Sequence, residues 1–138
     1  MKLMVMDGQG GGIGAAIIKG LREAVGNDIE IFALGTNSIA TSNMMKAGAN
    51  RGATGENAIV ETSRKVGFIL GPLAIMMANS MMGEVTPAMA SAVSSSDARK
   101  ILIPLTQERV TVVGVCDEPL PHLVKKVIAI IKEITEDV

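Results

Sequence analysis

The 138-residue sequence contains no tyrosine and no tryptophan, and it has only two phenylalanines, one cysteine and one histidine. A single cysteine cannot form a disulfide within the chain, which is typical of proteins of the reducing cytoplasm, and we expect that location. The net charge is -1 and basic residues do not cluster. Because a nucleic-acid site needs a basic stripe or aromatic stacking platforms, we expect no nucleic-acid partner.

Long uninterrupted apolar runs are also missing. From Val66 to Ser96 the only charged residue is Glu84, which at first suggests a membrane segment. However, Gly71-Pro72, Asn79-Ser80 and Gly83 interrupt this stretch, and a membrane-spanning helix needs about 20 predominantly apolar residues. We therefore expect a buried strand followed by a core helix, and no membrane partner.

The most informative feature that is present is a glycine-rich segment near the start of the chain. The run Asp7-Gly8-Gln9-Gly10-Gly11-Gly12-Ile13-Gly14 joins an apolar strand, Leu3 to Met6, to an amphipathic helix that begins near Ile13 and ends before Gly26. Five glycines within seven positions leave the backbone amides bare, and the helix directs its unpaired N–H groups and the positive end of its dipole to the same place. This pattern predicts an anion cradle, most often used for phosphate. The alternative is a tight turn whose glycines serve packing alone.

Asp7 is an acidic residue beside this cradle. We expect its carboxylate to accept hydrogen bonds from N–H groups of the loop and so to fix the turn. The alternative is coordination of Mg²⁺ for phosphoryl chemistry. Since no second carboxylate stands within two residues of Asp7, we predict no metal site there.

Strand-like and helix-like segments alternate along the rest of the chain, which predicts a parallel sheet covered by helices on both faces. The later strands are expected at residues 30–34, 50–53, 67–70, 101–105 and 110–115, and the later helices up to residue 47, at 54–66 and 73–82, from Thr86-Pro87 and after Pro121. Only four residues separate the last two strands, too few for a parallel crossover, so they predict an antiparallel hairpin. The sequence thus predicts one α/β domain over residues 1–138, three-layered and Rossmann-like, whose mostly parallel sheet has an antiparallel edge strand.

Two resemblances rest on these motifs. Gly8-x-x-x-Gly12-Ile13-Gly14 resembles the glycine motif of the short-chain dehydrogenase/reductase family, with Asp7 in place of its usual threonine, and Gly10-x-Gly12-x-x-Ala15 matches the dinucleotide fingerprint. Over nearly its full length the chain also resembles a bacterial family catalogued as domain of unknown function 3842. The segments that carry this likeness include the glycine run, Ala33-Leu34-Gly35-Thr36-Asn37, Gly52-Ala53-Thr54-Gly55-Glu56-Asn57-Ala58-Ile59 and Glu118-Pro119-Leu120-Pro121-His122. That family implies no particular activity.

The resemblance to the dehydrogenases implies NAD or NADP, but two features of that family are missing. The chain has no tyrosine to donate a proton to the substrate. The position about 20 residues beyond the glycines, where an acidic residue would bind the adenosine ribose, holds Thr36-Asn37 instead. We expect Thr36 and Asn37 near the sugar, and Gly71 and Pro72 at the far end of the ligand. NADP, NAD and a mononucleotide all stay open as the cofactor.

The sequence is compatible with three functions and does not decide whether the protein is an enzyme. The first is a nucleotide-binding module, with NAD(P) as a candidate ligand and without a self-contained catalytic set. The second is a small enzyme that uses Asp7, Glu56 or His122 in metal-assisted phosphoryl-transfer or hydrolytic chemistry. The third is a structural oligomeric domain without a nucleotide. For the first function the predicted binding residues are Asp7, Gly8, Gln9, Gly10, Gly11, Gly12, Ile13, Gly14, Thr36, Asn37, Gly71 and Pro72.

The sequence also offers some evidence on partners. Four methionines recur at helical spacing, and this pattern is typical of core or subunit-interface packing. We therefore expect a homo-oligomer in addition to the small-molecule nucleotide. The four residues are Met76, Met77, Met81 and Met82.

Overall fold

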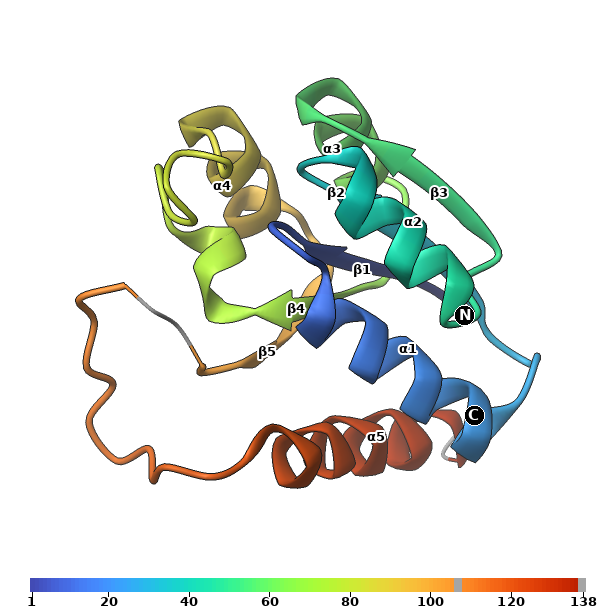
Figure 1. Ribbon diagram of the computed structural model, residues 1–138. Helices are drawn as coiled ribbons and strands as arrows, with labels where there is room; N and C mark the ends of the chain where they lie inside the picture. The colour runs from blue at the N-terminus through green and yellow to red at the C-terminus, as the bar shows by residue number, and fades with distance from the viewer. Residues whose placement is uncertain (106–107, 137–138) are drawn as a thin grey trace.

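A sheet of parallel strands forms the middle of three layers (Figure 1). The computed structural model describes residues 1–105 and 108–136. Along the chain the elements are β1 (Lys2–Asp7), α1 (Gly12–Val25), β2 (Glu30–Gly35), α2 (Ser38–Lys46), β3 (Arg51–Thr54), α3 (Glu56–Ser63), β4 (Phe68–Pro72), the 3-10 helix η1 (Leu73–Met76), α4 (Pro87–Ser95), β5 (Arg99–Ile103) and α5 (Leu120–Glu136). The predicted three-layer α/β class is confirmed.

β1 lies at the centre of the sheet because both of its faces are apolar. Leu3 and Val5 pack into a core cluster with α1, α2 and α5, whereas Met4 and Met6 pack into a second cluster with α3, η1 and α4. All four side chains are fully buried. A strand covered on both faces carries a continuous apolar run, which is why this strand could be recognised in the sequence.

The strand order β3-β2-β1-β4-β5 places a reversal beside β1. The chain moves outward in one direction from β1 through β2 to β3, and then returns to the other side of β1 with β4 and β5. Successive helices therefore leave β1 and β4 on opposite faces of the sheet, and a crevice opens at the carboxyl ends of these two strands. Open α/β sheets bind their ligands at such a reversal.

The predicted antiparallel edge is wrong. β5 pairs with β4 in parallel, and the predicted strand at residues 110–115 is absent from the described chain. In Figure 1 this part of the chain loops away from the protein body before α5 begins. The crossover that a parallel β5 needs is supplied by α4, which precedes it. The valine-rich run that predicted a strand has no neighbouring strand to pair with, and residues 106–107 of the expected link lie outside the described residues.

Two predicted helices are shorter in the structure. The helix expected at 54–66 is α3, because Thr54 is the last residue of β3 and Gly55 takes the capping position. The helix expected at 73–82 is only the single turn η1. Beyond it Asn79, Met81 and Met82 have φ angles of 66°, 55° and 55°. Left-handed residues cannot continue a right-handed helix.

The apolar stretch from Val66 to Ser96 contains β4, η1 and α4. The start of α4 is as predicted: the Thr86 hydroxyl accepts a hydrogen bond from the Met89 N–H at 3.1 Å, and Pro87 occupies the first helical turn. In the part of the chain that the structure describes, no helix combines the length and apolarity needed to cross a membrane.

Arg22, in the last turn of α1, joins two loops at the amino ends of the strands, the one between α1 and β2 and the one between α2 and β3. Its Nε donates to the Gly48 carbonyl at 2.8 Å, and its Nη1 donates to the carbonyls of Gly26 and Ile29 at 2.9 Å. Its Nη2 donates to the Asn50 side-chain oxygen at 2.5 Å. One guanidinium group thus holds the end of the sheet opposite the crevice.

We expect Arg22→Ala to lower the free energy of unfolding by about 2–4 kcal/mol, because several carbonyls lose a charged donor at once. Urea denaturation followed by circular dichroism measures this. The matched control is Arg64→Ala, since Arg64 makes an exposed ion pair with Glu61 at 3.1 Å. The control should cost less than about 0.5 kcal/mol. Equal losses in the two variants would contradict the assigned role of Arg22.

Candidate functional site

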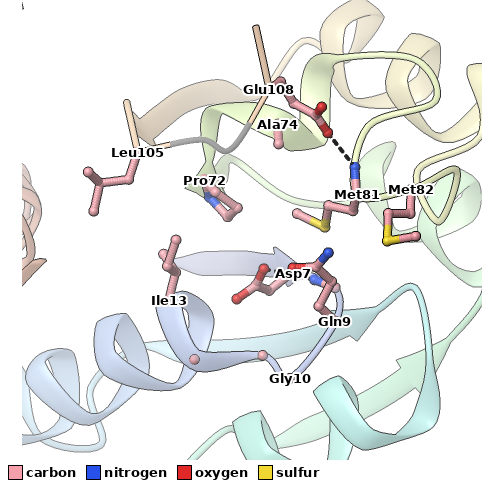
Figure 2. A pocket seen from close by; sticks show the side chains of 13 residues that line it. Asp7, Gln9, Gly10, Ile13, Pro72, Ala74, Met81, Met82, Leu105 and Glu108 are labelled. Carbon is pink, nitrogen blue, oxygen red and sulfur yellow. Dashed lines mark hydrogen bonds between the residues drawn. The ribbon is translucent and has the colours of Figure 1, made fainter. Parts of the chain in front are cut away.

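A cavity of about 510 Å³ lies at the carboxyl ends of β1 and β4. Its volume is within the usual range for small-molecule sites, roughly 300–1,000 Å³, and its position is the reversal in strand order. In Figure 2 the loop between β1 and α1 forms the lower side of the cavity, and segments that follow β4 and β5 form the upper side. The lining residues are Asp7, Gly8, Gln9, Gly10, Gly11, Gly12, Ile13, Pro72, Ala74, Met81, Met82, Leu105 and Glu108.

Asp7 is folded into the glycine loop, residues 7–14. Its side chain is 4% exposed, and its two carboxylate oxygens accept hydrogen bonds from the N–H groups of Gly8 and Gly14, each at 2.8 Å. The turn-fixing role predicted for Asp7 is therefore confirmed. Burial raises the pKa of Asp7 above its ordinary value of 3.8, and the nearby Glu84 charge adds to this rise, while the hydrogen bonds from loop N–H groups oppose it.

Three of the loop glycines are required by packing or by backbone conformation. A side chain at Gly8 would come within 2.6 Å of Met81 Sδ, and a side chain at Gly11 within 2.9 Å of the Ala40 backbone. Gly11 also has a φ of 72°, which disfavours any residue with a Cβ. A side chain at Gly14 would meet Met44 Sδ at 2.5 Å. The alternative explanation of the glycines, packing alone, accounts for these three positions.

Gly10 and Gly12 are different. A Cβ built on either residue would meet nothing within 4 Å, and neither has a φ in the left-handed region. Among the residues that the structure describes, no hydrogen-bond acceptor is bonded to the N–H of Gly10 or of Gly12. Both residues line the cavity, and Gly12 is the first residue of α1. Packing and backbone conformation therefore do not explain these two glycines.

Glu84 contacts the glycine loop beside the cavity, and the sequence reasoning missed it. Its Oε1 accepts hydrogen bonds from the Gln9 N–H at 2.8 Å, from the Thr36 hydroxyl at 2.7 Å and from the Asn37 side-chain amide at 2.8 Å. Partial burial alone would raise the pKa of Glu84, but these hydrogen bonds outweigh it and hold the pKa below the ordinary 4.5. The available signal was that Glu84 is the only charge in a long apolar stretch.

The structure brings most of the predicted site residues together. Asp7 to Ile13 and Pro72 line the cavity, and Gly14 bonds to Asp7 from inside the loop. Thr36 and Asn37 lie beside the loop, outside the lining, with their side chains hydrogen-bonded to Glu84. Gly71 is also outside the lining, where a Cβ would collide with the Met6 carbonyl in the neighbouring strand.

The residues considered for metal-assisted chemistry lie on separate elements. Glu56 begins α3 and accepts a hydrogen bond from the Thr86 hydroxyl at 2.6 Å, while His122 and Cys116 are exposed at and before α5. Among the described residues, no group of three or more histidine, cysteine, aspartate or glutamate side chains is arranged to hold a metal ion. Nothing in this geometry favours Asp7 as a ligand, since both of its oxygens are engaged by loop amides.

We expect the stabilising contribution of Asp7, measured as wild type minus Asp7→Ala, to be largest below about pH 3.8 and to decline as the pH rises through the raised pKa of the folded protein. The sign follows from linkage: between the two pKa values the folded state binds more protons than the unfolded state. Urea unfolding of both proteins from about pH 3 to pH 8 measures the difference. A contribution that grows with pH would show that the amide hydrogen bonds outweigh the burial of the charge.

Comparison with known proteins identifies a structural neighbour of the fold and the family of the chain. The crystal structure of a dodecameric FMN-dependent UbiX-like decarboxylase from Escherichia coli O157:H7 aligns with a TM-score of 0.53 and 16% identity, covering 99% of this chain and 94% of that one. At this identity the likeness shows the fold alone. No curated protein matches the chain. The family model for a domain of unknown function, DUF3842, matches residues 2–136. This chain therefore belongs to the DUF3842 family.

Proposed function

We propose that the protein binds a phosphate-bearing nucleotide in the cavity above the glycine loop, with the phosphate on the N–H groups of Gly10 and Gly12. The observation that carries this proposal is that these two glycines line the cavity, face open space and have N–H groups without an acceptor among the described residues. The start of the 14-residue helix α1 adds the positive end of its dipole at the same place. Of the remaining predicted residues, Pro72 lines the same cavity, whereas Thr36, Asn37 and Gly71 lie outside its lining.

The charge of the cavity limits how tightly a phosphate binds. The described lining contains two carboxylates, Asp7 and Glu108, and neither lysine nor arginine. Asp7 is already hydrogen-bonded to loop amides, and Glu108 accepts a hydrogen bond from the Met81 N–H at 2.6 Å. The ligand's negative charge would therefore be balanced by backbone amides and the helix dipole alone. We expect a Kd on the order of micromolar rather than nanomolar.

FMN is the first ligand to test. The sequence alone leaves NAD, NADP and a mononucleotide open, and the structural neighbour that shares this fold is described as FMN-dependent. Its decarboxylase activity is not carried over, because fold similarity does not transfer chemistry. NAD and NADP remain the second pair of candidates.

We expect FMN to bind wild type without a metal ion, and Gly12→Val to weaken that binding at least about tenfold, because the new side chain would occupy the space over the phosphate position. Isothermal titration with FMN, NAD, NADP and ATP, each with and without Mg²⁺, measures this. The matched control is Gly67→Val. Gly67 is also exposed and unstrained, but it lies at the opposite end of the sheet, and its nearest neighbour is the Lys2 carbonyl oxygen at 4.0 Å.

Other outcomes of the same titration support the other functions. Binding that requires Mg²⁺ and disappears in Asp7→Asn would support metal-assisted chemistry at Asp7. The absence of binding by every nucleotide would support a structural domain. If Gly12→Val and Gly67→Val weaken FMN binding equally, with circular dichroism unchanged in both, the phosphate is not at Gly12.

The segment that carries Met81 and Met82 also supports a proposed homo-oligomer. The Met82 side chain is 98% exposed at the rim of the cavity, and Val113 is 96% exposed in the chain that precedes α5. Apolar side chains this exposed are typical of interaction surfaces when they gather. The structural neighbour is described as dodecameric.

We expect wild type to sediment as an oligomer at micromolar concentration and Met82→Glu to shift it to a smaller species, because a buried unpaired carboxylate destabilises an apolar interface. Analytical ultracentrifugation measures both. Ile39→Glu is the control, since Ile39 is 66% exposed on α2, and it should leave the oligomer unchanged. A wild-type monomer at these concentrations would refute the proposal.

A further inference from the structure

The crevice over the glycine loop has two ends, and only one of them is open. The open end lies toward β4 and β5, where Pro72, Leu105 and Glu108 line the cavity. The other end lies over the carboxyl end of β2. No residue from Glu30 to Asn37 is among those lining the cavity.

The β2 end is filled by the segment that follows η1, residues 77–86, which we call the clasp. The position that a Cβ of Gly8 would occupy is 2.6 Å from both Met81 Sδ and the Thr36 hydroxyl oxygen, and 3.1 Å from Glu84 Oε1. The clasp therefore packs directly on the first glycine of the loop. Glu84 then joins three parts of the molecule, because its acceptor oxygen binds the loop at Gln9 and the β2 end at Thr36 and Asn37.

The clasp is held in this position by contacts of its own. The Ser80 hydroxyl donates to the Ala74 carbonyl at 2.6 Å, and the Asn79 N–H donates to the Val85 carbonyl at 2.7 Å. Val85 is fully buried, and the Met81 N–H donates to a carboxylate oxygen of Glu108, which lies on the same upper side of the cavity (Figure 2). These contacts attach the clasp to η1 and to the segment that follows β5.

The closed end is where a dinucleotide would need room. In a doubly wound sheet the pyrophosphate sits on the glycine loop, and the adenosine ribose reaches the carboxyl end of the second strand. In this protein that strand end is hydrogen-bonded to Glu84. A ligand with a single nucleotide unit, extending from the loop toward β4, would avoid the clasp.

We propose that Glu84 makes the site selective for mononucleotides by closing the β2 end of the crevice against the second half of a dinucleotide. This inference rests on the proposed function and assigns it a ligand class. Glu84 acts here as a specificity-determining residue. It closes the crevice by bonding the loop to the β2 end, and its contact with the ligand is not required.

FMN and FAD are the matched probes, because FAD is FMN extended by an adenosine monophosphate unit. We expect wild type to bind FMN about 100-fold more tightly than FAD, and Glu84→Ala to reduce that ratio about tenfold while FMN affinity is retained. Fluorescence titration of each flavin measures the two Kd values. Glu84→Gln is the matched control: its amide oxygen can accept the same three hydrogen bonds, so it should keep the crevice closed and the wild-type ratio.

Each outcome bears on one proposal or both. Failure of wild type to bind either flavin contradicts the proposed function, and this inference with it. Equal affinity of wild type for FMN and FAD contradicts the inference alone. If Glu84→Gln binds FAD as tightly as Glu84→Ala does, then charge repulsion rather than closure of the crevice keeps FAD out of the wild-type site. In that case the inference is wrong. Loss of FMN binding in Glu84→Ala would instead assign Glu84 the role of shaping the loop.

A measurement without ligand tests the closure itself. Amide hydrogen exchange at Gln9 should be at least about tenfold slower in wild type than in Glu84→Ala, because the N–H of Gln9 is bonded to the carboxylate. Exchange at Gly10, whose N–H has no acceptor among the described residues, is the internal reference. Unchanged exchange at Gln9 would show that the clasp does not close the loop in solution.

Discussion

The carboxylate of Asp7 is the contact on which the site depends. It bonds the first and the last glycine of the loop, so the chain must turn tightly between β1 and α1. Because these N–H groups point inward to Asp7, the acceptor-free N–H groups of Gly10 and Gly12 are the ones left for another anion. An ordered loop therefore requires that the Asp7 carboxyl group be buried, and this burial raises its pKa.

The sequence predicted best what depends on neighbours along the chain. β1, the glycine loop and α1 follow one another directly, and the apolar run, the bare backbone and the amphipathic pattern each point to the same structure. The cap of α4 at Thr86 is equally local. The hairpin failed because a valine-rich run indicates a strand only where a partner strand exists, and pairing is decided by distant parts of the chain.

In the candidate site, too, the part that is local in sequence was predicted and the part that comes from distant segments was not. Its lower side, Asp7 to Ile13, is contiguous in sequence and was predicted. Its upper side comes from Met81, Leu105 and Glu108, which the sequence reasoning did not connect with the loop. Thr36 and Asn37, expected near the sugar of a ligand, lie beside the loop, and their side chains are bonded to a carboxylate 48 and 47 residues away. The clasp that brings Glu84 there depends on left-handed residues other than glycine, for which the sequence has no clear signal.

The strand order also has a consequence for how the chain reaches this structure. Leu3 pairs with Ile31 on one side and with Phe68 on the other, so the central strand acquires its second neighbour only once the chain has been synthesised as far as β4. Until then β1 has an apolar face and an unpaired edge. Sheets built from such distant pairings form slowly, and a nascent chain with an exposed strand edge is prone to aggregate. The central strand thus precedes both of its neighbours in the chain, and it is fully enclosed only when the later neighbour, β4, has joined the sheet.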